Sequence, residues 1–290
     1  MLRAMPAASP LTRRLQDGAG SLSRNQRVLA KHVLANYQAV AFSTVKELAA
    51  AARVSEATVV RFAQALGFKG YPDLQREIRR VVRADMKGTE RFKLTYSVKE
   101  PAKKGPLSAI IEREIDNISA LEKALDLKTY GRAARVLREA SAVMIVGTRS
   151  SAPLAHHMWF GLDKIEIPVT RALAVTTETY DRLARMDARA CVVVLGFPRY
   201  LRELVDLLEF AKARPLKTVV ITDSPYSALR GDINLHAPVE SAAYVASHCA
   251  PLILINGLMH EVSLLDKSRT LNALNRFEAL ADSKAYFHAA

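Results

Sequence analysis

The hydrophobic pattern of the first part of the chain predicts two short helices packed against each other. Over residues 44–52, apolar side chains recur at i, i+3, i+4 and i+7 behind a capping box made by Thr44 and Glu47. A second helix, with Ser55 as its N-cap, repeats this spacing at Val59, Phe62, Ala63 and Leu66. Gly67 supplies the left-handed stop after the second stripe. The residues between the two helices, "ARV" at 52–54, allow only a tight turn.

Later in the chain the pattern changes to short apolar runs that alternate with helical stretches. Strong runs cover residues 141–147, 191–196 and 217–222, and weaker ones lie near 167–170 and 233–236. Two helical patterns, with isoleucines at 111, 115 and 118 in the first, precede these runs. Strands alternating with helices predict a parallel sheet covered on both faces, with ligands bound at the carboxyl ends of the strands.

Two short helices joined by a tight turn, the second with a polar outer face, are typical of a helix-turn-helix unit. The amino-terminal end and outer face of the second helix would then enter a DNA major groove. The side chains predicted to face bases are Ser55, Glu56, Ala57, Thr58, Arg61 and Gln64. Those predicted to contact phosphates are Lys46, Arg53 and Lys69. The alternative is a plain helical hairpin with a solvated face.

The distribution of charge favours the DNA-binding interpretation. The chain carries a formal charge of +13. Residues 1–86 hold 14 Lys and Arg against 6 Asp and Glu, whereas residues 141–290 hold 16 against 15. Such an asymmetry indicates that a polyanion meets the first domain only. On charge alone, a merely soluble basic surface would explain the excess equally well.

Composition gives the remaining bounds. Cys191 and Cys249 show no metal-ligand spacing, which fits free buried thiols in a reducing compartment. No apolar run is long enough to span a bilayer. We therefore expect a cytoplasmic protein with no membrane contact, no metal and no cofactor. The first twenty residues are expected to form a disordered basic arm.

The run "VSEATVVRFAQALGFKGYPDL", residues 54–74, closely resembles the amino-terminal domain of the RpiR-type transcriptional regulators. These bacterial proteins join a helix-turn-helix domain to a sugar isomerase (SIS) domain. The resemblance implies an all-α helix-turn-helix domain joined to an α/β SIS domain, with a parallel sheet flanked by helices. The predicted segments are the arm at 1–20, the DNA-binding domain at 21–86, a linker at 87–106 and the SIS domain at 107–290.

The loop after the first predicted strand, "GTRSSAP", is the main candidate for binding an effector. It offers Gly147, Arg149, Ser150 and Ser151 at the start of a helix, an arrangement that suits an anion. It matches the glycine and paired-serine loop by which SIS domains hold a phosphosugar. The alternative is that these serines only cap the helix.

The loops after the next two predicted strands give weaker evidence for an effector site. SIS domains of this family usually carry Ser-x-Ser-Gly-x-Thr after the next strand, and residues 196–201 here lack those three hydroxyls. Arg199, with Arg149, is a candidate to replace them by a charged fork, or else a surface residue. The loop that follows offers Thr222, Asp223 and Ser224 as polar contacts, or merely a turn.

Together these features favour a DNA-binding regulator of carbohydrate or related catabolic genes. Its expected partners are a double-stranded DNA operator, a small anionic metabolite (a sugar phosphate or sugar acid) and further copies of itself, as a homodimer or homotetramer. Two other classes stay open. One is a SIS-type sugar phosphate isomerase, for which the acid–base candidates are Glu178, Glu240, His248 and His260. The other is an architectural DNA-bound protein whose SIS domain only oligomerises.

Overall fold

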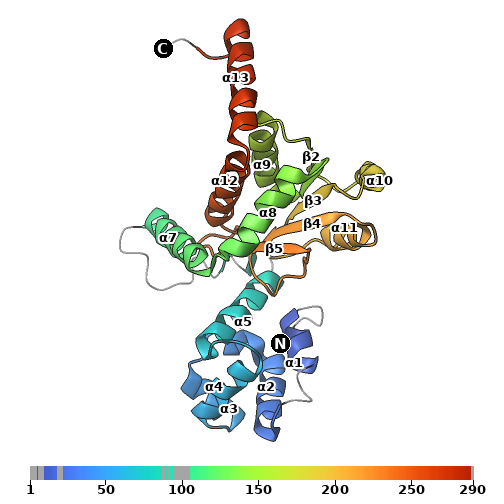
Figure 1. Cartoon of the computed structure of the whole chain (residues 1–290). Coiled ribbons are helices and arrows are strands. Elements are labelled where there is room, and N and C mark those ends of the chain that lie inside the picture. Colours follow the sequence, from blue (N-terminus) through green and yellow to red (C-terminus); the bar gives the residue numbers. More distant parts are fainter. Residues whose placement is uncertain are drawn as a thin grey trace. The chain divides into compact units, whose positions relative to one another are not determined.

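The computed structural model describes residues 5, 10–17, 22–86, 89–90, 92–93 and 105–288 (Figure 1). The chain divides into two compact units, Met1–Ser97 and Val98–Ala290. The boundary between them falls inside the predicted linker at 87–106, most of which lies outside the described residues. The boundaries predicted for the domains stay predictions.

Unit 1 is helical, and its helices begin where the sequence supplies caps. They are α1 (Pro10–Asp17), α2 (Arg24–Val40), α3 (Val45–Ala52), α4 (Glu56–Ala65) and α5 (Tyr71–Asp85). Capping boxes start α2 at Ser23 and α3 at Thr44, as the sequence predicts for Thr44. Tyr37 and Phe62 are both fully buried at the centre of the unit.

Helix α1 corrects the expectation of a disordered arm. Residues 10–17 form a helix that packs against α2 and α5. Leu11 and Leu15 on α1 are fully buried, with 0% and 1% of their surface exposed. The expectation is therefore wrong for residues 10–17, because two leucines four residues apart give this short helix an apolar side that the core of unit 1 accepts. The rest of the predicted arm, except Met5, lies outside the described residues.

Helix α5 holds the connection between α2 and α3. The backbone oxygen of Ser43 accepts hydrogen bonds from Tyr71 Oη at 2.7 Å and from Gln75 Nε2 at 2.6 Å. Arg79 Nε donates to the oxygen of Ala41 at 2.7 Å. Burial raises the pKa of Tyr71 to about 12, so its hydroxyl remains a donor at any physiological pH. These bonds fix the point from which the helix-turn-helix unit starts.

Unit 2 is built around a five-stranded sheet of order β2-β1-β3-β4-β5, in which every neighbouring pair is parallel. The strands are β1 (Val143–Gly147), β2 (Val169–Ala172), β3 (Cys191–Leu195), β4 (Lys217–Thr222) and β5 (Ile233–His236). Every residue of β1 and β3 is buried, as expected for strands covered on both faces. All five strands predicted from the sequence are present.

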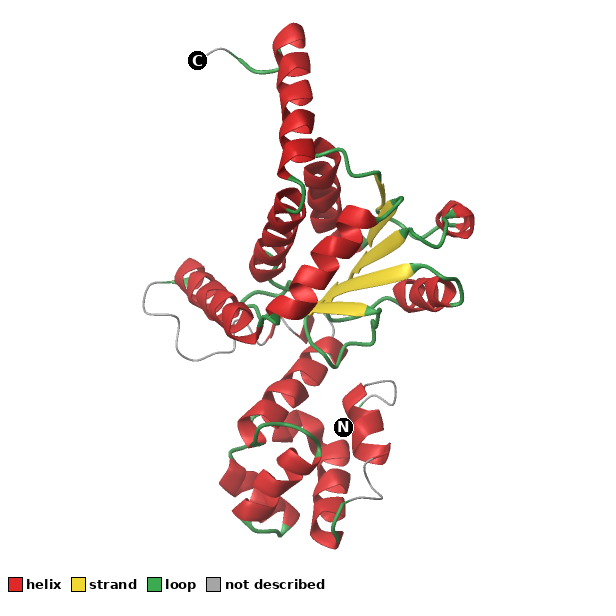
Figure 2. Cartoon of the chain, in the orientation of Figure 1, coloured by secondary structure: helices red, strands yellow, loops and turns green. Residues whose placement is uncertain are grey.

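Helices cover both faces of the sheet (Figure 2). The helices of unit 2 are α7 (Pro106–Ala124), α8 (Leu127–Glu139), α9 (Ala152–Lys164), α10 (Thr177–Arg185), α11 (Arg202–Lys212), α12 (Cys249–Leu264) and α13 (Lys267–Lys284). Helices α8, α9 and α12 form one apolar core with the sheet, and α10 and α11 form a second core on the opposite face. The predicted architecture of an all-α unit followed by an α/β unit is confirmed.

The two cysteines differ in exposure. Cys191 on β3 is buried, and burial raises its pKa to about 12, so the thiol is inert as a nucleophile. Cys249, at the first turn of α12, is exposed. The expectation that both thiols are buried is wrong for Cys249, because the apolar residues around it in the sequence face the core from other sides of α12.

Within the described residues, no helix by itself is long and apolar enough to cross a membrane. Only α12 and α13 taken together reach that length and composition, and they are bent by 106° at their junction.

Candidate DNA-binding and effector sites

The inner face of α4 anchors this helix in unit 1. The stripe predicted from the sequence, Val59, Phe62, Ala63 and Leu66, is buried throughout. Ser55 Oγ accepts from the backbone N–H of Thr58 at 3.2 Å and so caps the amino-terminal end of α4. At the other end Gly67 adopts a φ of +78°, the left-handed conformation that favours glycine. Both ends of α4 are therefore set by residues that the sequence identified.

The outer face of α4 presents its side chains to solvent. Eight of the nine residues predicted to contact DNA are exposed: Lys46, Arg53, Ser55, Glu56, Ala57, Arg61, Gln64 and Lys69. Thr58 is the exception, because only 7% of its surface is exposed and its Oγ1 lies 2.8 Å from Ser55 Oγ. Placing Thr58 at the exposed end was wrong: it follows the cap by three residues and turns inward beside Val59.

Val60 is a surface residue that the sequence analysis missed. It is 37% exposed and lies on the outward side of α4 with Ala57, Arg61 and Gln64. An apolar side chain at this position can contact a thymine methyl group. The sequence pattern could have identified it, because Val60 lies outside the i, i+3, i+4 stripe of residues that face the core.

The cations around α4 differ from those on α5. Among the described residues, no ion pair involves Lys46, Arg53, Arg61 or Lys69. On α5, by contrast, Arg76 pairs with Asp73 at 3.2 Å and Arg80 pairs with Glu77 at 2.7 Å. The basic side chains near α4 are therefore available to a polyanion.

The candidate effector site lies where the order of the strands reverses. From β1 the chain runs to β2 on one side, and it then places β3 on the other side of β1. The connections that follow β1 and β3 lead into α9 and α11, which belong to the cores on opposite faces of the sheet. Such a switch point leaves a crevice at the carboxyl ends of the two strands, the usual ligand site of an open α/β sheet.

The loop after β1 is closely packed at its base and open at its tip. A Cβ atom on Gly147 would lie 2.8 Å from both Ala155 Cβ and the Ser151 oxygen, so only glycine fits there. Thr148 is buried, and its Oγ1 has no hydrogen-bond partner among the described residues. Arg149 and Ser150 are exposed, whereas Ser151 is buried. Of the predicted effector residues in this loop, Arg149 and Ser150 are therefore exposed to solvent.

The loop after β3 is anchored to the loop after β4. Arg199 is exposed and adopts a φ of +69°, and Arg149 in the loop after β1 has a φ of +52°. Such left-handed backbone is unusual for arginine and is often found at functional sites. Next to Arg199, Tyr200 Oη donates to Asp223 Oδ1 at 2.5 Å. The first turn of α11 holds the acidic Glu203, whereas the first turn of α9 holds no acidic residue, so the start of α9 suits an anion better.

The loop after β4 is a closed turn. The hydroxyl of Thr222 is buried and donates to Ser227 Oγ at 2.9 Å. Ser224 is also buried, and its Oγ accepts from the backbone N–H of Tyr226 at 3.1 Å. Of the two interpretations given to these residues, the structure favours the turn over the ligand contact, because the hydroxyls of Thr222 and Ser224 are buried and each makes a hydrogen bond within the turn.

The residues considered for isomerase chemistry lie in three parts of unit 2. Glu178 stands at the start of α10 and His260 is exposed on α12. Glu240 and His248 lie in the segment between β5 and α12. Burial lowers the pKa of His248 although the nearby Glu114 opposes this, and its Nε2 has no partner among the described residues.

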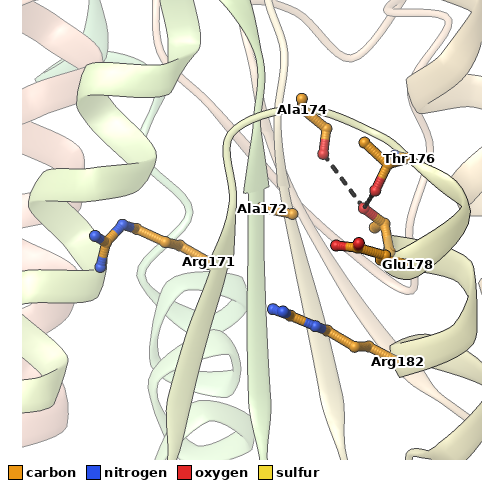
Figure 3. Close-up of a pocket in the computed structure, with 7 residues that line it drawn as sticks. Arg171, Ala172, Ala174, Thr176, Glu178 and Arg182 are labelled. Atoms are coloured by element: carbon orange, nitrogen blue, oxygen red, sulfur yellow. Dashed lines mark hydrogen bonds between the residues drawn. The ribbon is translucent and has the colours of Figure 1, made fainter.

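A shallow pocket of about 210 Å³ lies at the end of β2 (Figure 3). Glu178 and Arg182 line it from α10, and Arg171 points to the other side of β2, where its guanidinium stacks 3.6 Å above the ring of Trp159. No predicted effector residue lines this pocket. The sequence analysis did not identify Arg182, because an exposed arginine on a helix gives no distinctive pattern.

Comparison with known proteins matches both units. A family model described as "Helix-turn-helix domain, rpiR family" matches residues 10–83, and the SIS domain model matches residues 136–260. The chain belongs to the RpiR family. It is a transcriptional regulator of this type with a SIS domain.

Relatives of this RpiR-family chain match it over nearly its whole length. It is 26% identical to the uncharacterized HTH-type transcriptional regulator YbbH of Bacillus subtilis, over 93% of this chain and 96% of that one. It is 23% identical to the HTH-type transcriptional regulator HexR of Escherichia coli, over 93% and 94% of the two chains. The fold resembles that of the Vibrio vulnificus NanR protein complexed with ManNAc-6P, with a TM-score of 0.58, 19% identity, and coverage of 93% and 97%.

Proposed function

We propose that this RpiR-type regulator controls carbohydrate or related catabolic genes, and that a small anionic metabolite bound in the SIS domain changes its affinity for DNA. The metabolite is a sugar phosphate or a sugar acid. A NanR structure of the same fold is complexed with ManNAc-6P, which supports a phosphosugar as one of the two classes. We further propose that the protein works as a homo-oligomer, because one helix-turn-helix unit reads only a half-site.

One observation carries the proposal. The loops that follow β1 and β3, at the carboxyl ends of two neighbouring parallel strands, carry Arg149 and Arg199, and both residues are exposed on left-handed backbone. A guanidinium binds carboxylate and phosphate through two parallel hydrogen bonds, so two arginines on loops at the same end of the sheet favour an anionic ligand. The hydroxyl of Thr148, in the loop after β1, is buried and has no hydrogen-bond partner among the described residues.

Two of the four acid–base candidates lie away from the loops after β1 and β3, which makes an isomerase the second choice. Proton transfer beside a carbonyl needs a base within hydrogen-bond reach of the substrate. Glu178 lies at the β2 pocket and His260 on the exposed side of α12, so neither joins Arg149 and Arg199 at the crevice. We therefore propose that the protein is a sensor. Turnover of a sugar phosphate that depends on Glu240 or His248 would show instead that it is an enzyme.

The first experiment measures binding to a duplex selected from random sequences by the wild-type protein, using fluorescence anisotropy. Arg61→Ala should weaken binding by about 10- to 100-fold, the usual cost of a lost bidentate base contact. The matched control is Arg76→Ala, which removes an arginine already paired with Asp73. Affinity should fall steeply with salt, and a flat salt response would contradict phosphate contact.

The second experiment screens sugar phosphates and sugar acids for a shift in melting temperature. A bound metabolite raises the melting temperature and should change the DNA affinity measured above. Replacing Arg149 and Arg199 by alanine should abolish the shift. Arg132 and Arg135, two exposed arginines on α8, serve as the control pair. If no compound of either class shifts the wild-type protein, the SIS domain only oligomerises and the sensor proposal fails.

A further inference from the structure

The outer face of α4 has an apolar residue at its centre. Val60 lies one turn after Glu56 and one turn before Gln64, and all three side chains are exposed. Ala57, which is also exposed, lies beside Val60 at a spacing of three residues. The face predicted to enter a major groove therefore has polar side chains on either side of an apolar centre.

The fold of unit 1 does not require a valine at this position. The neighbouring Val59 is fully buried in the core, whereas Val60 is 37% exposed. Valine is a poorer helix former than alanine, because its branched side chain is restricted against the preceding turn. At two other exposed positions of α4, Ala57 and Ala65, the helix does have alanine. A single exposed apolar residue is ordinary on a protein surface, but one at the centre of a face that meets base edges affects what that face can bind.

The major groove offers one kind of apolar group to such a side chain. Thymine presents its C5-methyl group there, whereas the polar groups of all the bases are hydrogen-bond donors and acceptors. Val60 cannot pair with a donor or an acceptor, so a polar base edge beneath it would lose its water and gain no partner. Burial of a methyl group, by contrast, contributes to affinity. Because branching holds a valine in one main rotamer in a helix, little side-chain entropy is lost on contact.

The length of the face indicates which base pair Val60 meets. From Glu56 to Gln64 the helix rises by about 12 Å. Base pairs follow one another every ~3.4 Å, so a helix that lies along the groove covers about three or four of them with this face. Val60 lies midway between the two residues and therefore meets a central pair.

We propose that Val60 is a specificity-determining residue that contacts the 5-methyl group of a pyrimidine at the centre of the half-site. In unmodified DNA that base is thymine, and 5-methylcytosine presents the same methyl group at the same place in the groove. The inference rests on the proposed function, because it requires α4 to enter a major groove. It adds a base that the operator must contain and a DNA modification that strengthens binding.

The test uses the full chain and the duplex that it selects from random sequences, with affinity measured by fluorescence anisotropy. Each thymine of a half-site is replaced in turn by uracil, which removes only the methyl group. At a central position this change should weaken binding of the wild type by about 4-fold, the effect of burying one methyl group. In Val60→Ala the thymine and uracil duplexes should bind equally at that position.

Two controls separate loss of the contact from damage to the fold. Both duplexes are measured with one protein sample, so any loss of folded protein cancels in the ratio of the two affinities. Val28→Ala removes an exposed valine from α2 and should keep the preference for thymine. Val60→Ala should also leave the dependence of affinity on salt unchanged, because a valine neutralises no phosphate.

Methylated DNA gives an independent measurement. At the position that responds to uracil, a cytosine–guanine pair and its 5-methylcytosine counterpart are compared in the same way. The wild type should bind the methylated duplex about 4-fold more tightly, and Val60→Ala should bind both duplexes alike. A wild type indifferent to either methyl group, or a Val60→Ala chain that keeps every preference, overturns the proposal.

Failure of this inference can be told apart from failure of the proposed function. A protein that binds no duplex would remove both. A protein that binds duplex DNA with a steep salt dependence, but without a preference for the methyl group, would leave the regulator standing and remove only the role of Val60.

Discussion

The outer face of α4 and the crevice between β1 and β3 are both candidate binding surfaces, but they are built differently. On α4 every side chain has its direction set by the helix, and the core-facing stripe holds that direction. In the crevice the direction of each side chain depends on how its loop closes its own hydrogen bonds, as the Tyr200–Asp223 bond and the turn at Thr222 show. A site carried by a helix is therefore easier to alter one residue at a time than a site carried by loops.

The largest effect expected from this comparison is on stability. Phe62→Ala removes a fully buried ring from the inner face of α4 and should lower the free energy of unfolding of unit 1 by about 3–5 kcal/mol. Gln64→Ala, two residues away on the exposed face, should change it by less than about 0.5 kcal/mol. Urea unfolding of both variants measures the difference. Equal losses would mean that α4 does not have two distinct faces.

A smaller effect is expected at the base of the crevice. Gly147→Ala places a Cβ atom 2.8 Å from the backbone oxygen of Ser151, and we expect a loss of about 1–3 kcal/mol as the start of α9 shifts. The control is Gly131→Ala on α8, where the nearest atom lies 3.7 Å away on Arg135, and which should be neutral or slightly stabilising. Denaturant unfolding of unit 2 distinguishes them, and a Gly147→Ala chain as stable as wild type would show that the close packing is not required.

The smallest effect is a dependence on pH. Burial holds the pKa of His248 below its unfolded value of 6.5, so the unfolded chain binds more protons between the two values. The free energy of unfolding should therefore rise with pH through this window. The stabilising contribution of neutral, buried His248 should be fully present above about pH 6.5, and it should be lost as the pH falls through the folded pKa. His248→Asn should flatten this part of the profile. A variant profile parallel to that of the wild type would contradict the assignment.

The same contrast explains how far the sequence predicts the molecule. The periods of α3 and α4 and the apolar runs of the five strands identify the elements and both units, because burial imposes these patterns directly. Thr58 was misplaced because a hydroxyl that belongs to a cap looks like any exposed polar residue. Thr222 and Ser224 offered two readings because no local pattern shows whether a loop hydroxyl is used by its own turn.

Helix α7 shows a further limit. Periodicity predicts that a helix has an apolar side, but it does not indicate whether that side meets the core of its own unit or another surface. Here Asn117 and Leu121 face inward, and Ile111 and Ile115 face outward. Only the packing of α12 distinguishes the two sides.

Helix α1 has a practical consequence for anyone who shortens this protein. A chain that starts at residue 21, where an amino-terminal tail would ordinarily be trimmed, lacks Leu11 and Leu15. The apolar surfaces of α2 and α5 that these leucines cover would then be exposed to solvent. Loss of DNA affinity in such a shortened protein would reflect a damaged scaffold, and it would say nothing about contacts between the tail and the double helix.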